Sequence, residues 1–234
     1  MNLKRPAEIE AMAEAAVINR RALEAVEAVL APGVSTAELN DVAERVIVEG
    51  GGRPAFKGYH GFPATLCTSV NEVVVHGIPN DRPLEDGDIV SIDVGTFYRG
   101  YAADQAMTYA VGEVDAQVRR LLDVTERSLY AGIDAAQAGA RLGDVSAAIQ
   151  GVVEAAGMWV VREFVGHGIG REFHEPPDVP NFGRPGTGPV LRPGLVLAIE
   201  PMVALSRTEV VVLDDGWTAP TKTGVPAAHF EHTV

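Results

Sequence analysis

The chain has 234 residues, of which 47% are hydrophobic, and carries a formal net charge of -13. This length and composition predict one globular domain with a sizeable core, and the acidic balance argues against a generic nucleic-acid binder, which needs a basic face. The single cysteine, Cys67, excludes an internal disulfide and a cysteine-based zinc site, and it favours a reducing compartment.

The first predicted element is an amphipathic helix over about residues 6–30. Pro6 lies in its first turn, where proline is favoured, and Glu8 and Glu14 are among the acids that interrupt its apolar residues. The segment is therefore expected to be neither a signal peptide nor a membrane span.

A second helix is predicted within residues 33–51. Ser35 and Glu38 form a capping-box pattern at its start, and the glycines at 50–52 end it. The apolar spacing of this helix recurs within residues 139–157. Similarity between two amphipathic helices is a weak signal by itself, so further repeats are needed before duplication is inferred.

The stretch 53–71 has no counterpart in the second half of the chain and is expected to be an inserted loop. It concentrates the side chains of Phe56, Tyr59, Phe62 and Cys67. Aromatic residues in such a loop usually pack, but these precede the candidate site described below and could line a pocket.

One ten-residue strand pattern occurs twice, and each copy ends in a carboxylate. Residues 84–93 read LEDGDIVSID, and residues 191–200 read LRPGLVLAIE. Side chains alternate in a strand, so Val90 and Ile92 share one face and Asp93 projects from the other, beside small neighbours. A buried carboxylate without a partner is costly, so the economical interpretation is a cation between two halves; an acid paired to arginine or lysine is the alternative.

The repeats keep one order along the chain. After its repeated helix, each half has one His-Gly-Ile, at His76 and at His167, and then the strand that ends in an acid. These ordered repeats indicate duplication. The chain is therefore predicted to be a single domain, 1–234, made of pseudo-symmetric halves of about 1–112 and 113–234 that share one core.

Further acids follow each repeated strand. A hairpin is predicted from strand 88–95 to strand 101–111, and it is expected to bring Asp104 opposite Asp93. The second half supplies its own second acid, Glu231, in the motif HFEHTV.

Seven side chains combine into one candidate metal centre. They are Asp93, Asp104, Glu200, Glu231, His76, His167 and His174. Four carboxylates with an imidazole can hold two divalent cations about 3.5–4 Å apart. Hard oxygen donors with one imidazole suit Mn, Fe(II), Co or Zn rather than Cu(I). The glycine-rich segment between His167 and His174 does not match a helical HExxH zinc site.

Five ordered motifs resemble those of the type I methionine aminopeptidases, within the pita-bread metallopeptidases. The motifs are YHGFPATLCTSVNEVVVHGIP, GDIVSIDVG, VGHGIGREFHEPPDVPNFG, LAIEPM and HFEHTV. The resemblance covers nearly the whole chain. It implies an α+β fold, in which duplicated half-domains share a central, mainly antiparallel sheet and the helices pack outside.

The resemblance also implies a set of roles. The two metal ions would be bound by Asp93, Asp104, His167, Glu200 and Glu231, with Asp104 and Glu231 bridging. A metal-bridging hydroxide would attack the carbonyl after an N-terminal methionine, with Glu200 as general base or proton shuttle. His174 would polarise the carbonyl, and His76 would contact the scissile amide. The other histidines, His60, His229 and His232, are expected to be structural.

By the same resemblance, a pocket would hold the methionine side chain. Its lining would be Phe56, Tyr59, Phe62, Cys67, Phe173 and Trp217, together with the two histidines at 76 and 174. The resemblance implies a preference for substrates with a small second residue. It also implies a cytoplasmic enzyme that acts on nascent polypeptides, as a monomer, with a possible transient ribosome contact and with neither membrane binding nor sequence-specific nucleic-acid binding.

Some positions depart from the family pattern. Ala102 stands where members usually have histidine, and Gln105 where threonine is usual, so hydrogen bonds that support Asp104 are expected to differ. Phe56 and Phe62 replace residues that are often cysteine and tyrosine, which is expected to narrow the pocket. Members usually continue beyond EHTV, so the strand with Glu231 is expected to have less support.

Three alternatives stay open at this point. A proline-directed aminopeptidase or prolidase usually carries an additional N-terminal domain, for which this chain has no room. A type II methionine aminopeptidase carries a helical insertion in its second half. A non-enzymatic binding protein of the same fold would bind no stoichiometric metal.

Overall fold

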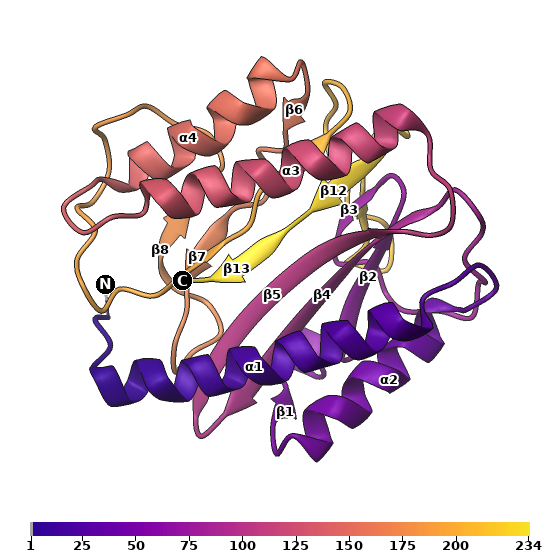
Figure 1. Cartoon of the computed structure of the whole chain (residues 1–234), viewed down its shortest axis with the longest axis horizontal. Coiled ribbons are helices and arrows are strands. Elements are labelled where there is room, and N and C mark those ends of the chain that lie inside the picture. The colour runs from indigo at the N-terminus through magenta and orange to yellow at the C-terminus, as the bar shows by residue number, and fades with distance from the viewer. Residues whose placement is uncertain (1) are drawn as a thin grey trace.

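Helices and a large sheet form the framework of the computed structural model, which describes residues 2–234 (Figure 1). Its helices are α1 (Pro6–Val29), α2 (Thr36–Glu49), α3 (Ala116–Ala135) and α4 (Leu142–Ala155), with a short 3-10 turn, η1 (Tyr59–Gly61). The predicted cap of α2 is present, because the Glu38 N–H donates to Ser35 Oγ at 3.2 Å and the Ser35 N–H donates to Glu38 Oε2 at 2.8 Å. No helix within the described residues is long and apolar enough to cross a bilayer.

The large sheet has the strand order β1-β4-β5-β13-β9-β7-β8, and β2 also pairs with β4. Its strands are β1 (Arg53–Pro54), β2 (Leu66–Val70), β4 (Ile89–Tyr98), β5 (Tyr101–Ala110), β7 (Gly166–Gly168), β8 (Glu175–Val179), β9 (Leu197–Ile199) and β13 (Glu231–Thr233). Smaller sheets contain β3 (Val73–Val75), β6 (Trp159–Val160), β10 (Met202–Ala204), β11 (Ala219–Pro220) and β12 (Ala227–His229). All of the strand pairs are antiparallel.

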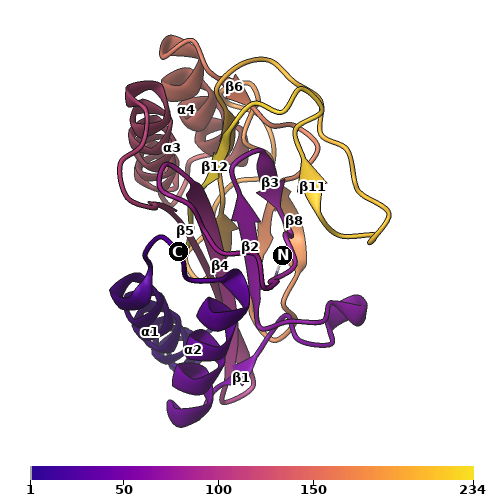
Figure 2. The ribbon, with the colours of Figure 1, turned by 90° about the vertical axis from the view of Figure 1, so that its right-hand side faces the viewer.

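The helices lie on one side of the large sheet (Figure 2). One core cluster joins α1 and α2 to β4 and includes Leu23, Val26, Leu39, Ile47, Val90 and Ile92. A second joins α3 and α4 to β9 and includes Leu121, Leu129, Val145, Ile149, Leu197 and Ile199. Because the apolar face of β4 is turned toward the helices, Asp93 projects from the opposite face of the sheet.

The β4–β5 hairpin forms as predicted, but its register differs. Asp93 pairs with Ala106, and Asp104 pairs with Gly95, so the expectation that the two acids lie directly opposite each other is wrong by two residues. A shift of two residues keeps both side chains on the same face, since side chains alternate with a period of two. The acids therefore still share one side of the sheet.

The segment 53–71 is more regular than the predicted loop. It contains β1, η1 and β2, and β2 pairs with β4 so that Cys67 lies opposite Asp93. The strand β13 pairs with β5 on one side and with β9 on the other. It therefore joins the N-terminal hairpin to the C-terminal strands.

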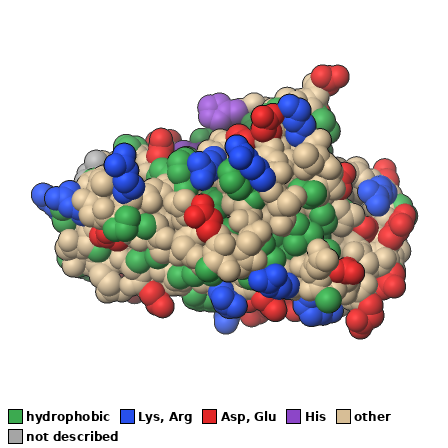
Figure 3. All heavy atoms as spheres, turned by 90° about the horizontal axis from the view of Figure 1, so that it is seen from above, with side chains coloured by type: hydrophobic (Ala, Val, Ile, Leu, Met, Phe, Trp, Pro, Cys, Tyr) green, Lys and Arg blue, Asp and Glu red, His purple; other side chains and the backbone are tan. Residues whose placement is uncertain are grey.

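On the face seen from above in Figure 1, basic and acidic side chains are interspersed among apolar ones and do not form one basic patch (Figure 3). This distribution agrees with the net charge of -13.

Candidate active site

Neighbouring strands of the large sheet bring the predicted metal ligands together. Asp93 lies on β4, Asp104 on β5, Glu231 on β13 and His167 on β7, and Glu200 directly follows β9. These strands are consecutive in the sheet order β4-β5-β13-β9-β7. One cavity is therefore lined by predicted ligands that are distant in the chain, such as Asp93 and Glu231, which are 138 positions apart.

Distances within this group are those of side chains that could share a cation. The ligand atoms of Asp104, His167 and Glu231 all lie within 4.8 Å of one another. His167 Nε2 is 3.7 Å from Asp104 Oδ2 and 3.7 Å from Glu200 Oε1. A second such group contains Glu200, Glu231 and His229.

Electrostatics oppose ionisation of this cluster when no cation is present. Burial, reinforced by the charges of Asp104 and Glu200, raises the pKa of Asp93 well above its ordinary value. Burial and the same neighbours raise the pKa of Glu231 in the same direction. The pKa of Asp104 is also raised by burial, although His167 partly offsets the effect.

Divalent cations fit this donor set. Within residues 2–234, the only ion-pair partners of these carboxylates are histidines, so the alternative of an acid paired to arginine or lysine does not hold. Asp93 Oδ1 and Glu231 Oε1 are buried and have no hydrogen-bond partner among the described residues. Buried carboxylates without a protein cation are the arrangement that metal coordination satisfies.

His174 and His76 lie on the wall of the same cavity. Burial lowers the pKa of His174 to about 4, and the Tyr59 hydroxyl lies 2.8 Å from His174 Nδ1. Burial also lowers the pKa of His76, whose backbone has a φ of 61°, in the left-handed region. Such backbone strain is often found at functional sites, where the surrounding structure holds it in place.

The loop before β8 is fixed by a buried ion pair. Lys4 Nζ lies 2.6 Å from Glu175 Oε2, and both side chains are only 5% exposed. Glu175 Oε1 accepts the Arg171 N–H at 3.0 Å, which closes the turn that carries His174. A Cβ at Gly170 would overlap the ends of the Lys4 and Glu175 side chains, so a larger residue there would displace the ion pair.

Aromatic side chains form the remaining wall of the cavity. Phe56 and Phe173 are in edge contact, with ring centroids 5.2 Å apart, and Phe62 and Trp217 are 5.1 Å apart. The lining consists of Phe56, Tyr59, Phe62, Cys67, Phe173 and Trp217 with the carboxylates and histidines. The cavity volume is about 150 Å³. All residues of the predicted pocket are therefore brought together.

Backbone hydrogen bonds surround Ala102 and Gln105, the two residues near Asp104 that depart from the family pattern. Ala102 is fully buried, and its N–H donates to the Gly170 carbonyl at 2.7 Å. The Gln105 backbone N–H donates to Asp104 Oδ1 at 3.0 Å. Asp104 is thus supported by its own strand, and its backbone N–H donates to Thr233 Oγ1 of β13 at 2.9 Å.

His229 is a site residue that the sequence interpretation did not include. Its side chain is 2% exposed, and Nε2 lies 3.4 Å from Glu200 Oε2. The signal that could have identified it is its position two residues before Glu231, because alternate residues of an extended chain can face the same side.

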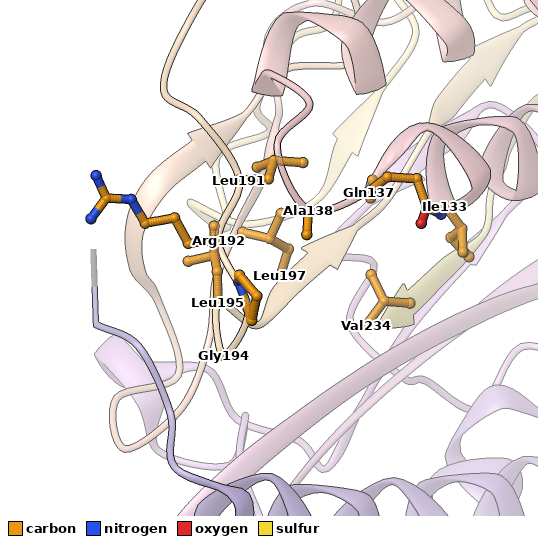
Figure 4. Close-up of a pocket in the computed structure, with 11 residues that line it drawn as sticks. Ile133, Gln137, Ala138, Leu191, Arg192, Gly194, Leu195, Leu197 and Val234 are labelled. Atoms are coloured by element: carbon orange, nitrogen blue, oxygen red, sulfur yellow. The ribbon is translucent and has the colours of Figure 1, made fainter.

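A larger hollow lies elsewhere, beside Val234, and has a volume of about 330 Å³ (Figure 4). Its lining is mostly aliphatic, and Arg192 is its only ionisable side chain. None of its lining side chains is a carboxylate or an imidazole, so it lacks the side-chain chemistry of the first cavity.

Comparison with known proteins identifies the chain's relatives. Residues 10–234 match the model of metallopeptidase family M24. The chain is 50% identical over 232 residues to the methionine aminopeptidase of Clostridium perfringens, covering 99% of this chain and 93% of that protein. It is 43% identical to the methionine aminopeptidase of Escherichia coli, covering 100% and 89% of the two chains.

Solved structures agree with the fold. The methionine aminopeptidase of Thermotoga maritima superposes with a TM-score of 0.98 at 47% identity, covering 100% of this chain and 94% of that one. The prolidase of Pyrococcus furiosus superposes with a TM-score of 0.80 at 23% identity, covers 99% and 61% of the two chains, and shows a shared fold alone. The predicted α+β pita-bread fold is confirmed. The chain therefore belongs to metallopeptidase family M24 and, within it, to the methionine aminopeptidases, which are metallo-exopeptidases.

Proposed function

We propose that this enzyme removes the N-terminal methionine of newly made polypeptides with two divalent cations. The cations would be held by Asp93, Asp104, His167, Glu200 and Glu231, with Asp104 and Glu231 bridging. One observation carries the proposal: the cluster of buried carboxylates without a protein cation forms one wall of an aromatic cavity. Cations bound there would supply Lewis-acid activation of water and of the scissile carbonyl. Mn, Fe(II), Co and Zn all suit such donors.

Glu200 is proposed as the general base and proton shuttle. Its side chain is 13% exposed, compared with 5% for Asp104 and 1% for Glu231. Glu200 is thus more accessible to solvent than these two carboxylates. A base must lie within hydrogen-bond reach of the proton that it takes, directly or through one water molecule.

His174 is proposed to donate a hydrogen bond to the scissile carbonyl oxygen. With a pKa lowered to about 4, its imidazole is neutral near pH 7. If the Tyr59 hydroxyl donates to Nδ1, the proton of the ring is on Nε2, which is then the donor available to the substrate. Donors placed where negative charge develops stabilise the transition state.

His76 is proposed to contact the scissile amide and to assist its departure. Its pKa is lowered, and its ring is held in edge contact with Phe164, at a centroid distance of 5.3 Å. The flanking Gly77 donates its N–H to Ser69 Oγ at 3.2 Å, which anchors this turn to β2.

The aromatic wall is proposed to bind the methionine side chain. Contacts between a thioether sulfur and aromatic rings contribute about 0.3–1.5 kcal/mol each. An apolar cavity of roughly 150 Å³ holds a molecule of the size of benzene, so the volume of about 150 Å³ fits one side chain and leaves little room beside it. A small second residue in the substrate is therefore preferred.

The cellular setting belongs to the same proposal. We propose that the enzyme acts on nascent chains in the cytoplasm, as a monomer and through transient contact with the ribosome. Neither a membrane nor a specific nucleic-acid sequence is needed for this reaction.

The test uses metal-stripped protein titrated with Mn(II) or Co(II) on a Met-Gly peptide and on an X-Pro peptide. Methionine release from the first peptide, saturating near two cations per chain, is expected. Activity only on the X-Pro peptide would favour a prolidase instead, and activity on neither peptide would contradict the proposal.

A variant separates the proposed ligands from the proposed catalytic histidine. His174→Ala is expected to bind both cations but to lose roughly 10²–10³-fold in kcat, because a donor to the developing oxyanion is removed. Loss of cations from His174→Ala would show that this division of roles is wrong. His232→Ala, which changes a histidine facing Tyr130 and not the cavity, is the matched control.

A further inference from the structure

The ring of His229 is held in place behind the catalytic carboxylate. Its backbone N–H donates to Thr108 Oγ1 at 2.9 Å, and its carbonyl accepts the Thr108 hydroxyl at 2.8 Å. This double contact fixes the end of β12 against β5. The imidazole is 2% exposed, so its position is set by packing on every side.

The buried nitrogen of this ring lies opposite carboxylates. His229 Nε2 has no hydrogen-bond partner within the described chain. It lies 3.4 Å from Glu200 Oε2 and 3.9 Å from Glu231 Oε2. A buried imidazole nitrogen that faces carboxylate oxygens is favourable when it carries a proton, because a lone pair there would face further lone pairs.

Glu200 extends between two imidazoles. Its Oε1 lies 3.7 Å from His167 Nε2, and its Oε2 lies 3.4 Å from His229 Nε2. Oε1 therefore lies on the side of His167, which belongs to the proposed ligand set. The oxygen that remains, Oε2, is the one that His229 approaches.

We propose that His229 is a positioning residue, whose Nε2–H donates to Glu200 Oε2 and fixes the orientation of this carboxylate. Metal-binding carboxylates are commonly oriented by such hydrogen bonds from residues behind them, and the loss of one typically lowers metal affinity or activity by about 10–100-fold. The inference rests on the proposed function, because it gives Glu200 the role of ligand and base.

The test compares His229→Ala with His229→Gln in the cobalt-loaded enzyme. The glutamine amide keeps an N–H donor near the position of Nε2, whereas alanine removes it. The measurements are the number and affinity of bound Co(II) by calorimetry, the visible absorption spectrum of bound Co(II), and kcat and KM on a Met-Gly peptide. Thermal unfolding of both variants checks that they fold, and His232→Ala serves as the unaffected control.

The expected result is that His229→Ala still binds the same number of Co(II) ions, with affinity reduced about tenfold and kcat reduced about 10–100-fold at nearly unchanged KM. His229→Gln should recover most of both losses. Loss of one Co(II), or a changed spectrum that glutamine does not restore, would overturn the inference in favour of direct metal ligation. Unchanged affinity and kcat in the alanine variant would overturn it as well.

The two proposals can fail separately. If the wild-type protein releases no methionine, the proposed function is wrong, and the Co(II) affinity of the variants still decides the role of His229. If the wild-type protein is active and only the His229 comparison fails, the proposed function stands.

Discussion

Two sets of buried acids in this molecule differ in whether a basic side chain of the protein compensates their negative charge. Glu175 lies against Lys4, and although burial raises its pKa, the lysine and the Asn2 amide outweigh burial and leave the pKa below its ordinary value. Asp93 and Glu231 have no such partner, and burial raises the pKa of both. Burial penalises the ionised form of the acids in both sets.

The difference separates a structural acid from a functional one. At Glu175 the chain supplies the cation itself, and the pair fixes the turn before β8. At the carboxylate cluster the described chain supplies no lysine or arginine, and in the proposed function bound divalent cations would compensate the negative charge. A buried acid is therefore informative mainly through what lies beside it.

The largest expected effect comes from breaking the internal pair. Lys4→Met removes the ammonium while keeping much of the side-chain volume, and it leaves Glu175 buried without its cation. We expect a loss of about 3–5 kcal/mol in the free energy of unfolding, measured with denaturant.

The control for this prediction is the double variant Lys4→Met with Glu175→Gln, which removes both charges. It should be substantially more stable than Lys4→Met alone. If the single variant unfolds at the wild-type denaturant concentration, the ion pair does not stabilise this region and the comparison fails.

The next effect is the response of stability to cations. For the wild type, Mn(II) at a hundred times its Kd should raise the free energy of unfolding by about 2.7 kcal/mol, because the cation binds only the folded cluster. Glu231→Gln should lose most of this gain, measured as the shift in Tm on metal addition.

Glu113→Gln is the matched control, because the Glu113 side chain is 95% exposed and its ion-pair partner is Arg119, not a residue of the site. It should show the full response. An equal shift in Glu231→Gln would mean that the cation binds elsewhere.

The pH dependence of the metal-free protein should have opposite signs at the two sites. Asp93 has a higher pKa in the folded state than in the unfolded state, where it is about 4. Its contribution to stability is therefore fully present below about pH 4 and is lost as the pH rises through the folded-state pKa. The lowered pKa of Glu175 contributes stability above about pH 4.3 that is lost as pH falls.

Asp93→Asn isolates the first of these contributions. Between pH 4 and neutrality the variant should gain stability relative to the metal-free wild type, by about 1.4 kcal/mol for each unit by which the pKa of Asp93 is raised. Denaturant unfolding in chelator across this range measures it. A constant difference between the two proteins would contradict the assignment.

The smallest effect tests a neutral hydrogen bond to His174, the residue that precedes Glu175 in the chain. Tyr59→Phe removes the hydroxyl that lies 2.8 Å from His174 Nδ1. A neutral hydrogen bond contributes about 0.5–1.5 kcal/mol, so kcat should fall roughly two- to tenfold. KM for a Met-Gly peptide and metal content should stay unchanged, because phenylalanine keeps the ring that lines the pocket; a larger change in KM than in kcat would show that the hydroxyl itself acts in substrate binding instead.

Local periodicity predicted much of this architecture. The capping box at Ser35, the alternation along β4 and the repeated acid-ending strand all depend on residues close in sequence, and the structure contains α2 and β4 where they were expected. The helix spacing and the strand faces could be predicted because they follow from the geometry of a single element.

The parts that were missed depend on partners distant in sequence. The sequence pattern predicts a loop where β2 lies, because the alternation of side chains within residues 66–70 does not show that they pair with β4. The register of Asp104 depends on the whole hairpin, and the position of His229 depends on Thr108, which is 121 residues away. The Lys4–Glu175 pair spans 171 residues. No local pattern shows such contacts.

The position of β13 between β5 and β9 has a consequence for the order of biosynthesis. Translation produces the hairpin of β4 and β5 early, but Glu231 and the strand that joins the two sides are produced after every other described strand. Until residues 231–233 have left the ribosome, the emerging chain lacks Glu231, one of the proposed ligands, and its sheet lacks the strand between β5 and β9. Each molecule can therefore assemble the proposed pair of cations only after its last described strand has been made.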